Sequence, residues 1–142
     1  MLVLTLTREA MGKESKIQQL CVRWFRLQYP EIASLLFSVP NGGTRILKEA
    51  IVLKKEGLVA GVSDLILLIP CGGYASLCIE MKTDDKTSRQ SASQKEWQKA
   101  AEAAGNKYIV CRSFDEFVTE VKKYLAPYIE KRFKSLLKDG KA

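Results

Sequence analysis

The chain has 142 residues, of which 46% are hydrophobic and 27% are charged, and its formal net charge is +7. This length fits one domain with one hydrophobic core and disfavours a second independent domain. The basic excess favours an anionic partner, nucleic acid first, although many basic proteins owe their charge to solvated faces. No apolar run could cross a bilayer and residues 1–7 do not resemble a secretory signal, so we expect a soluble, intracellular protein.

The sequence contains no histidine and four widely spaced cysteines. The absence of imidazole excludes Ser-His-Asp and Cys-His nucleophiles, His-ligated zinc and His-activated water. The cysteines form no CxxC pair, and three of them lie in or beside apolar runs, so we expect buried reduced thiols. An enzyme with this composition would work through carboxylates, lysine and metal ions.

Hydrophobic periodicity predicts three elements in the first part of the chain. Apolar residues recur at helical spacing over residues 8–28. A short strand is predicted over residues 35–39 and a second helix over residues 45–56. The prolines and glycines between these segments mark their ends.

The second part of the chain predicts a hairpin followed by a helix, a strand and further helix. The hairpin strands are expected over residues 64–69 and 74–82, and a polar loop over residues 83–89 follows them. The remaining expected elements are a helix capped by Ser91 or Ser93 and ended by Gly105, a buried strand over residues 108–111, a helix from Phe114 that Pro127 should kink or restart, and a basic C-terminal helix from about 128. Helices and strands in this order predict an α/β fold with a small central mixed sheet flanked by helices.

The hairpin carries the pattern most informative about function. Asp64 opens one strand, and Glu80-Met81-Lys82 ends the other. Alternate strand residues face the same side, so Glu80 and Lys82 should point together while Met81 points away. Charges on such apolar strands are costly unless they are paired or bound to metal, and a hard divalent cation is the expected partner.

Two carboxylates with a lysine suit the hydrolysis of a phosphodiester. Mg²⁺ takes oxygen ligands and keeps several waters, so Asp64, Glu80 and the backbone carbonyl of Met81 would suffice as its protein ligands. Lys82 could orient or deprotonate the attacking water, or stabilise transition-state charge. On these residues alone, an ordinary Glu80–Lys82 pair on a solvated strand is an equally weighted alternative.

The combined motifs resemble a known family. The run from Gly57 to Leu65, the ExK strand end and Ser91-Ala92-Ser93-Gln94 on the following helix are similar to the VRR-NUC domain of the PD-(D/E)xK nuclease superfamily. The resemblance covers most of the chain, to about Leu125, and Ser63 stands where the family usually has proline. It implies a restriction-endonuclease-like core and a Mg²⁺- or Mn²⁺-dependent nuclease.

The resemblance also implies a wider site. Asp64 and Glu80 match the metal ligands and Lys82 the catalytic lysine, while Glu14 matches an acid on the first helix that approaches the metal or its water shell. Gln94 matches a glutamine that hydrogen-bonds to the site. Without the resemblance, Glu14 would be read as a solvated carboxylate in a first helical turn and Gln94 as an exposed helix residue.

A glycine-containing loop supplies a further candidate for nucleic-acid binding. Asn41 and Arg45 flank Gly42-Gly43, where backbone amides and the guanidinium could hold a phosphate. A plain turn with a surface arginine has equal weight. Trp24 and Trp97 lie on apolar helix faces and are expected to anchor the core.

The basic C-terminal helix has three interpretations: a solvated surface, an arm that follows phosphates, or part of a dimer interface. Dimerisation is favoured slightly, because stand-alone members of the family look like compact homodimers suited to branched DNA. The leading hypothesis is a DNA endonuclease selective for four-way junctions or flaps, in the cytoplasm of a bacterial or phage-infected cell. The alternatives are a non-catalytic nucleic-acid-binding module and an RNA-directed nuclease.

Overall fold

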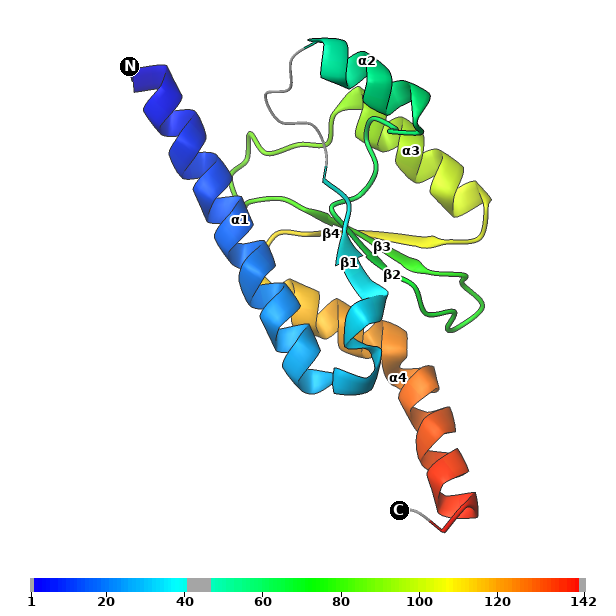
Figure 1. Cartoon of the computed structure of the whole chain (residues 1–142). Coiled ribbons are helices and arrows are strands. Elements are labelled where there is room, and N and C mark those ends of the chain that lie inside the picture. Colours follow the sequence, from blue (N-terminus) through cyan, green and yellow to red (C-terminus); the bar gives the residue numbers. More distant parts are fainter. Residues whose placement is uncertain (1, 41–46, 141–142) are drawn as a thin grey trace.

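The computed structural model describes residues 2–40 and 47–140 and contains one mixed four-stranded sheet with helices on both faces (Figure 1). The predicted α/β class is confirmed. No helix in these ranges is long and apolar enough to cross a bilayer. In chain order the elements are α1 (Leu2–Gln28), the 3₁₀ helix η1 (Pro30–Leu35), β1 (Leu36–Ser38), α2 (Leu47–Lys55), β2 (Leu65–Leu67), β3 (Leu77–Met81), α3 (Ala92–Ala103), β4 (Lys107–Cys111) and α4 (Phe114–Lys138).

The sheet has the strand order β1-β2-β3-β4, so β1 and β4 are its edges. The first three strands are antiparallel, and β3 pairs in parallel with β4. A parallel pair needs a long crossover, which α3 supplies between β3 and β4. The predicted hairpin is present, but its regular strands are shorter than expected because only three residue pairs join β2 to β3 before the chain widens toward the Cys71–Tyr74 bridge.

One face of the sheet carries the main hydrophobic core. Leu77, Ile79 and Met81 point to this face from β3 and are fully buried. They pack with Phe25 of α1 and Phe117 of α4, which cover the same face. Fully burying a side chain of this size contributes roughly 1.5–3 kcal/mol, so this layer fixes how α1 and α4 sit on the sheet. The other face carries Cys78 and Glu80 and is covered by α3.

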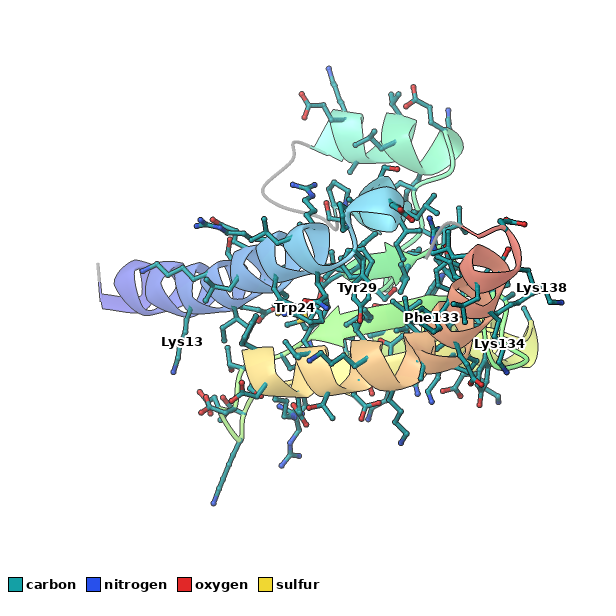
Figure 2. The ribbon with its side chains drawn as sticks, turned by 90° about the horizontal axis from the view of Figure 1, so that it is seen from below. Lys13, Trp24, Tyr29, Phe133, Lys134 and Lys138 are labelled. Atoms are coloured by element: carbon teal, nitrogen blue, oxygen red, sulfur yellow. The ribbon has the colours of Figure 1, made fainter. Side chains whose placement is uncertain are left out.

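Trp24 and the cysteines are in the environments expected for them, whereas Trp97 is half-buried outside the main core. Trp24 makes edge-to-face contacts with three aromatic rings, including Phe117 at a centroid distance of 6.2 Å, and Trp97 lies against Tyr108 at 6.2 Å. Figure 2 shows Trp24 and Tyr29 between the helices rather than at the outer surface. All four cysteines are free and buried.

The last helix differs from the expectation of a separate C-terminal helix. α4 runs from Phe114 through Pro127 to Lys138 as one helix, and it changes direction along its course in both Figure 1 and Figure 2. Proline removes one backbone hydrogen bond and clashes with the preceding turn, which bends a helix without necessarily ending it. The C-terminal half of α4 therefore projects from the body of the domain.

Candidate active site

The strand register brings Asp64 and Glu80 together. Leu65 pairs with Ile79 in the antiparallel β2–β3 ladder, so the residues one step further, Asp64 and Glu80, are cross-strand neighbours. The backbone N–H of Met81 donates a hydrogen bond of 2.7 Å to Asp64 Oδ2. This bond fixes the aspartate side chain at the end of the sheet.

The alternation along β3 places the lysine beside the same site. Met81 is fully buried in the core, on the face opposite to Glu80. Lys82 Nζ lies 3.7 Å from Glu80 Oε1, and the exposed fractions of the two side chains are 12% and 1%. Such burial rules out the alternative of an ordinary ion pair on a solvated strand.

Glu80 is held in an environment that opposes its ionisation. Burial raises its pKa to about 8, helped by the negative charge of Asp64 and a hydrogen bond with that carboxyl group, while Lys82 and Tyr108 act in the opposite direction. Two neighbouring carboxylates with one ammonium group are short of positive charge. The arrangement therefore favours an additional cation or proton.

Gln94 contacts the site because of how α3 begins. Its backbone N–H donates to Ser91 Oγ at 3.2 Å, and its Oε1 accepts from the Ser91 N–H at 2.8 Å, which completes a capping box. With Oε1 occupied in this way, the amide nitrogen faces the sheet and donates to Glu80 Oε1 at 3.0 Å. The helix start thus fixes which end of the amide meets the carboxylate.

The loop before β2 is pressed against the same helix start. Gly61 has a φ of +84°, and a Cβ on it would lie 2.3 Å from the backbone oxygen of Ser93. Only glycine fits this approach. Ser63, where proline was expected from the resemblance, is fully buried and donates a hydrogen bond of 3.1 Å to the Leu65 carbonyl. These contacts set the position from which Asp64 enters the site.

Glu14 reaches the site from α1. Its pKa is raised by burial and by the charge of Asp64, and lowered by Lys82. The two acids also line one groove of about 700 Å³ between α1 and β1. The structure therefore places Glu14 near Asp64 and Lys82. Because α1 begins at Leu2 and not at residue 8 as expected, Glu14 lies in the interior of the helix and not in its first turn.

Tyr108 is a site residue that the sequence did not reveal. The parallel register pairs Cys78 with Tyr108, so Tyr108 lies diagonally from Glu80 on the same face of the sheet. Its hydroxyl donates a hydrogen bond of 3.4 Å to Glu80 Oε2 and accepts one of 3.2 Å from Gln90. The period-two pattern of β4 could have indicated which face of the sheet Tyr108 is on. Its contact with Glu80 depends on the register between β3 and β4, which the sequence does not supply.

The donor set fits a hard divalent cation that keeps most of its water. Within residues 2–40 and 47–140, no three Asp, Glu, His or Cys side chains form a ready metal cluster. Mg²⁺ does not require one, because one or two carboxylates with waters and substrate phosphate complete its shell. Asp64 and Glu80 could supply these carboxylates, and the lack of a second positive charge beside them is the observation that fits a metal ion.

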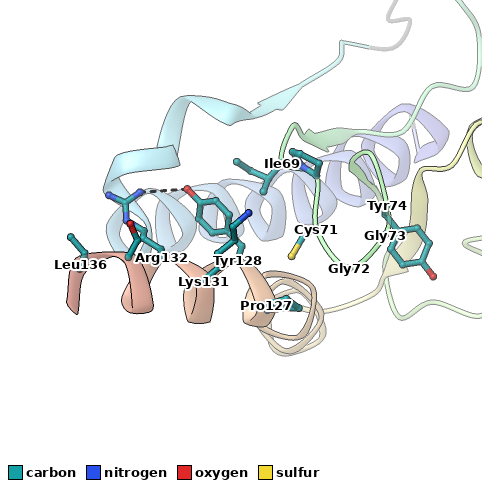
Figure 3. A pocket seen from close by; sticks show the side chains of 12 residues that line it. Ile69, Cys71, Gly72, Gly73, Tyr74, Pro127, Tyr128, Lys131, Arg132 and Leu136 are labelled. Atoms are coloured by element: carbon teal, nitrogen blue, oxygen red, sulfur yellow. Dashed lines mark hydrogen bonds between the residues drawn. The ribbon is translucent and has the colours of Figure 1, made fainter. Parts of the chain in front are cut away.

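Two other candidate regions do not contribute to this description. Asn41 and Arg45 lie outside the described residues. A separate cavity of about 820 Å³ lies between the turn at Gly72-Gly73 and the Pro127–Leu136 part of α4 (Figure 3). It contains none of the five predicted catalytic residues, Glu14, Asp64, Glu80, Lys82 and Gln94.

Comparison with known proteins places this geometry in a family. A model of the VRR-NUC domain, which defines a nuclease family with DNA as its substrate class, matches residues 8–115. A solved structure described as a VRR_NUC domain protein is similar, with a TM-score of 0.69 and 26% sequence identity over 80% of this chain and 88% of that chain. The comparison with curated proteins gave no match. The chain therefore belongs to the VRR-NUC domain family and has a nuclease-type fold.

Proposed function

We propose that this chain is a Mg²⁺- or Mn²⁺-dependent endodeoxyribonuclease that hydrolyses phosphodiester bonds in branched DNA. The observation that carries the proposal is the pairing of half-buried Asp64 with fully buried Glu80, which is short of positive charge and has Lys82 on the same face. A divalent ion bound by these carboxylates and the Met81 carbonyl would polarise the phosphate and lower the pKa of a water molecule. The products would be a 5′-phosphate and a 3′-hydroxyl.

The side chains around the carboxylates have separate tasks in this proposal. Lys82 lies against Glu80 and would orient the attacking water or stabilise charge on the phosphate oxygens. Gln94 and Tyr108 hold the two oxygens of Glu80, which fixes the plane of the carboxylate. Glu14 would act on the water shell from α1. Asn41 and Arg45 are proposed to contact the DNA backbone.

A homodimer would suit a branched substrate. Ile129, Phe133 and Leu137 follow one another at four-residue spacing on the projecting half of α4, and they are 42%, 58% and 56% exposed. Figure 2 shows Phe133 on this part of the helix. A stripe of this kind supports burial against a second copy, and a two-fold dimer would present two sites to the two-fold symmetric four-way junction. The four buried thiols suit the reducing cytoplasm of a bacterial or phage-infected cell.

A cleavage panel tests the function. The substrates are four-way junction, flap, duplex and single-stranded DNA together with RNA, each at low salt with Mg²⁺, with Mn²⁺ or with EDTA. We expect metal-dependent cleavage that is fastest on the junction or flap and is lost in Lys82→Ala and Glu80→Ala. Lys123→Ala, at an exposed position of α4, is the matched control and should cleave normally. Failure to cleave any substrate would leave a nucleic-acid-binding module, and cleavage of RNA alone would redirect the proposal.

Light scattering tests the dimer. The full chain should have twice the mass of a monomer, and Phe133→Ser with Leu137→Ser should reduce it to one chain. Lys134→Ser, at an exposed position of the same helix, should leave the mass unchanged. A wild-type chain that is monomeric at all concentrations rules out the dimer.

A further inference from the structure

A groove leads away from the site along α1. It is about 700 Å³ in volume, and the α1 residues that line it, from Glu14 to Leu27, face β1. Asp64 lies at one end with Glu14, and the groove continues past the three residues of β1. Because α1 rises 1.5 Å per residue, the distance along the helix from Glu14 to Arg26 is about 18 Å. The groove is thus a continuous path out of the site.

The charge of the groove changes along this path. The site end carries the carboxylates of Glu14 and Asp64, while Arg23 and Arg26 line the distal part. Both arginines are exposed, and neither guanidinium group has a hydrogen bond or ion pair to another residue in the described part of the chain. By contrast, Arg132 beside the other cavity is already in an ion pair with Glu31. Two free guanidinium groups in a groove suit phosphate, which they can bind with paired hydrogen bonds.

The remaining lining suits a flexible strand. Gln18 and Gln19 supply amide groups between the acidic and basic parts, and Phe37 of β1, a residue that is 41% exposed, is the aromatic residue that borders the groove. An exposed ring can stack on any base without reading its sequence.

Groups of the β1 backbone also face the groove. The backbone of β1 is bonded to the β2 side through the Leu35 carbonyl and the Val39 N–H. In an antiparallel ladder this register turns the N–H and C=O of Ser38 toward the free edge. Backbone N–H groups at such an edge are further donors for phosphate oxygens.

We infer that this groove binds a single strand of DNA as it leaves the cleavage site. The inference rests on the proposed function for the direction of the strand, and it deepens that function by naming where the unpaired strand of a flap or junction lies. An 18 Å path corresponds to about five nucleotides of a strand that keeps the stacked spacing of 3.4 Å per nucleotide, and to fewer nucleotides of an extended strand. The two arginines bind phosphates three or more nucleotides from the scissile bond, and Phe37 stacks on a base between them and the site.

Binding measured without catalysis tests the inference. The full chain is titrated into a fluorescein-labelled 20-nucleotide thymidine oligomer in EDTA, and anisotropy is followed from 50 to 300 mM salt. The double variant Arg23→Gln, Arg26→Gln removes two contacts. On single strands each contact contributes a slope of about 0.7 in log affinity against log salt, so the slope should fall by about 1.4 and affinity at 0.1 M salt by about 25-fold. The midpoint of thermal unfolding should not change, because both side chains are exposed.

A charge-matched control separates the groove from general electrostatics. Lys131→Gln with Lys138→Gln removes the same net charge from α4 and should change affinity less than threefold. Equal or greater loss in this control, or an unchanged slope in the arginine variant, would overturn the inference. A chain that binds the oligomer through the arginines but never cleaves DNA would contradict the proposed function alone. Junction cleavage that persists while the arginine variant binds like the wild type would contradict the groove alone.

Discussion

Glu80→Gln is expected to stabilise the metal-free protein at alkaline pH while it abolishes cleavage. In the folded chain burial and the neighbouring Asp64 raise the pKa of Glu80 from 4.5 to about 8. The folded state therefore holds a proton on Glu80 that the unfolded state has already released. Glutamine is a neutral side chain of the same shape, and it can keep hydrogen bonds to Gln94 and Tyr108 without the charge.

The sign and size of the effect follow from proton linkage. Because the folded pKa is raised, the stability associated with Glu80 is complete below pH 4.5 and is lost as the pH rises to about 8. At 1.36 kcal/mol per pKa unit, the shift corresponds to on the order of 5 kcal/mol. Glu80 is 1% exposed, so solvent does not screen the effect away. Glu80→Gln should therefore be more stable than the wild type at pH 8.5 by a few kcal/mol and equal to it within error below pH 4.5.

Urea unfolding followed by circular dichroism measures this difference. Both proteins are unfolded in EDTA at pH 4.5, 6.5 and 8.5, and only the difference between them is interpreted, since other groups titrate in both. Mg²⁺ at 100 times its dissociation constant should stabilise the wild type by about 2.7 kcal/mol and the variant much less. If the two proteins have the same free energy of unfolding at pH 8.5 in EDTA, the carboxyl of Glu80 is not strained and the physical case for a bound cation fails.

Three further predictions concern the surroundings of the carboxylates. Gly61→Ala should lower the free energy of unfolding by more than about 2 kcal/mol, because the added Cβ would lie 2.3 Å from a backbone atom. Gly57→Ala, at a φ of +108° with open space around it, should cost about 1 kcal/mol. Equal costs in thermal melts would show that the loop is not pressed against α3. Tyr108→Phe keeps the ring and removes the hydroxyl, so it should weaken Mg²⁺ binding in calorimetry about 10-fold with little loss of stability; unchanged affinity would exclude an orienting role. Ser91→Ala should cost about 1 kcal/mol of stability. The cleavage rate should fall further in Gln94→Ala than in Ser91→Ala, because only Gln94 also contacts Glu80. Equal cleavage rates in the two variants would show that Gln94 acts only as a capping residue.

The positions of Glu80 and Met81 could be predicted because they depend on local geometry. Alternation along a strand sends neighbouring side chains to opposite faces whatever the rest of the fold does. Ser91 and Ser93 were both possible caps of α3, and the choice of Ser91 follows from a glutamine three residues later, which is also local. Pro127 was correctly expected to bend a helix, but sequence could not decide between a bend and a break, since packing of the flanking turns determines the outcome.

The parts that could not be predicted depend on contacts between distant segments. Tyr108 meets Glu80 through the register of a parallel strand pair, and neighbouring registers would leave the hydrophobic pattern of β4 almost equally satisfied. The approach of Glu14 to Asp64 depends on how α1 lies on the sheet, which the burial of Phe25 and its partners decides. The short 3₁₀ helix η1 also has no strong sequence signal beyond Pro30.

The double role of Gln94 has a consequence for motion. The first turn of α3 cannot fray without withdrawing the amide that holds Glu80, because one side chain forms both contacts. Local opening of a helix end, normally among the cheapest fluctuations of a protein, is here tied to the geometry of the carboxylates. Amide hydrogen exchange at residues 91–94 should therefore slow when a divalent cation binds, so that backbone protection in this turn reports directly on how well the site is organised.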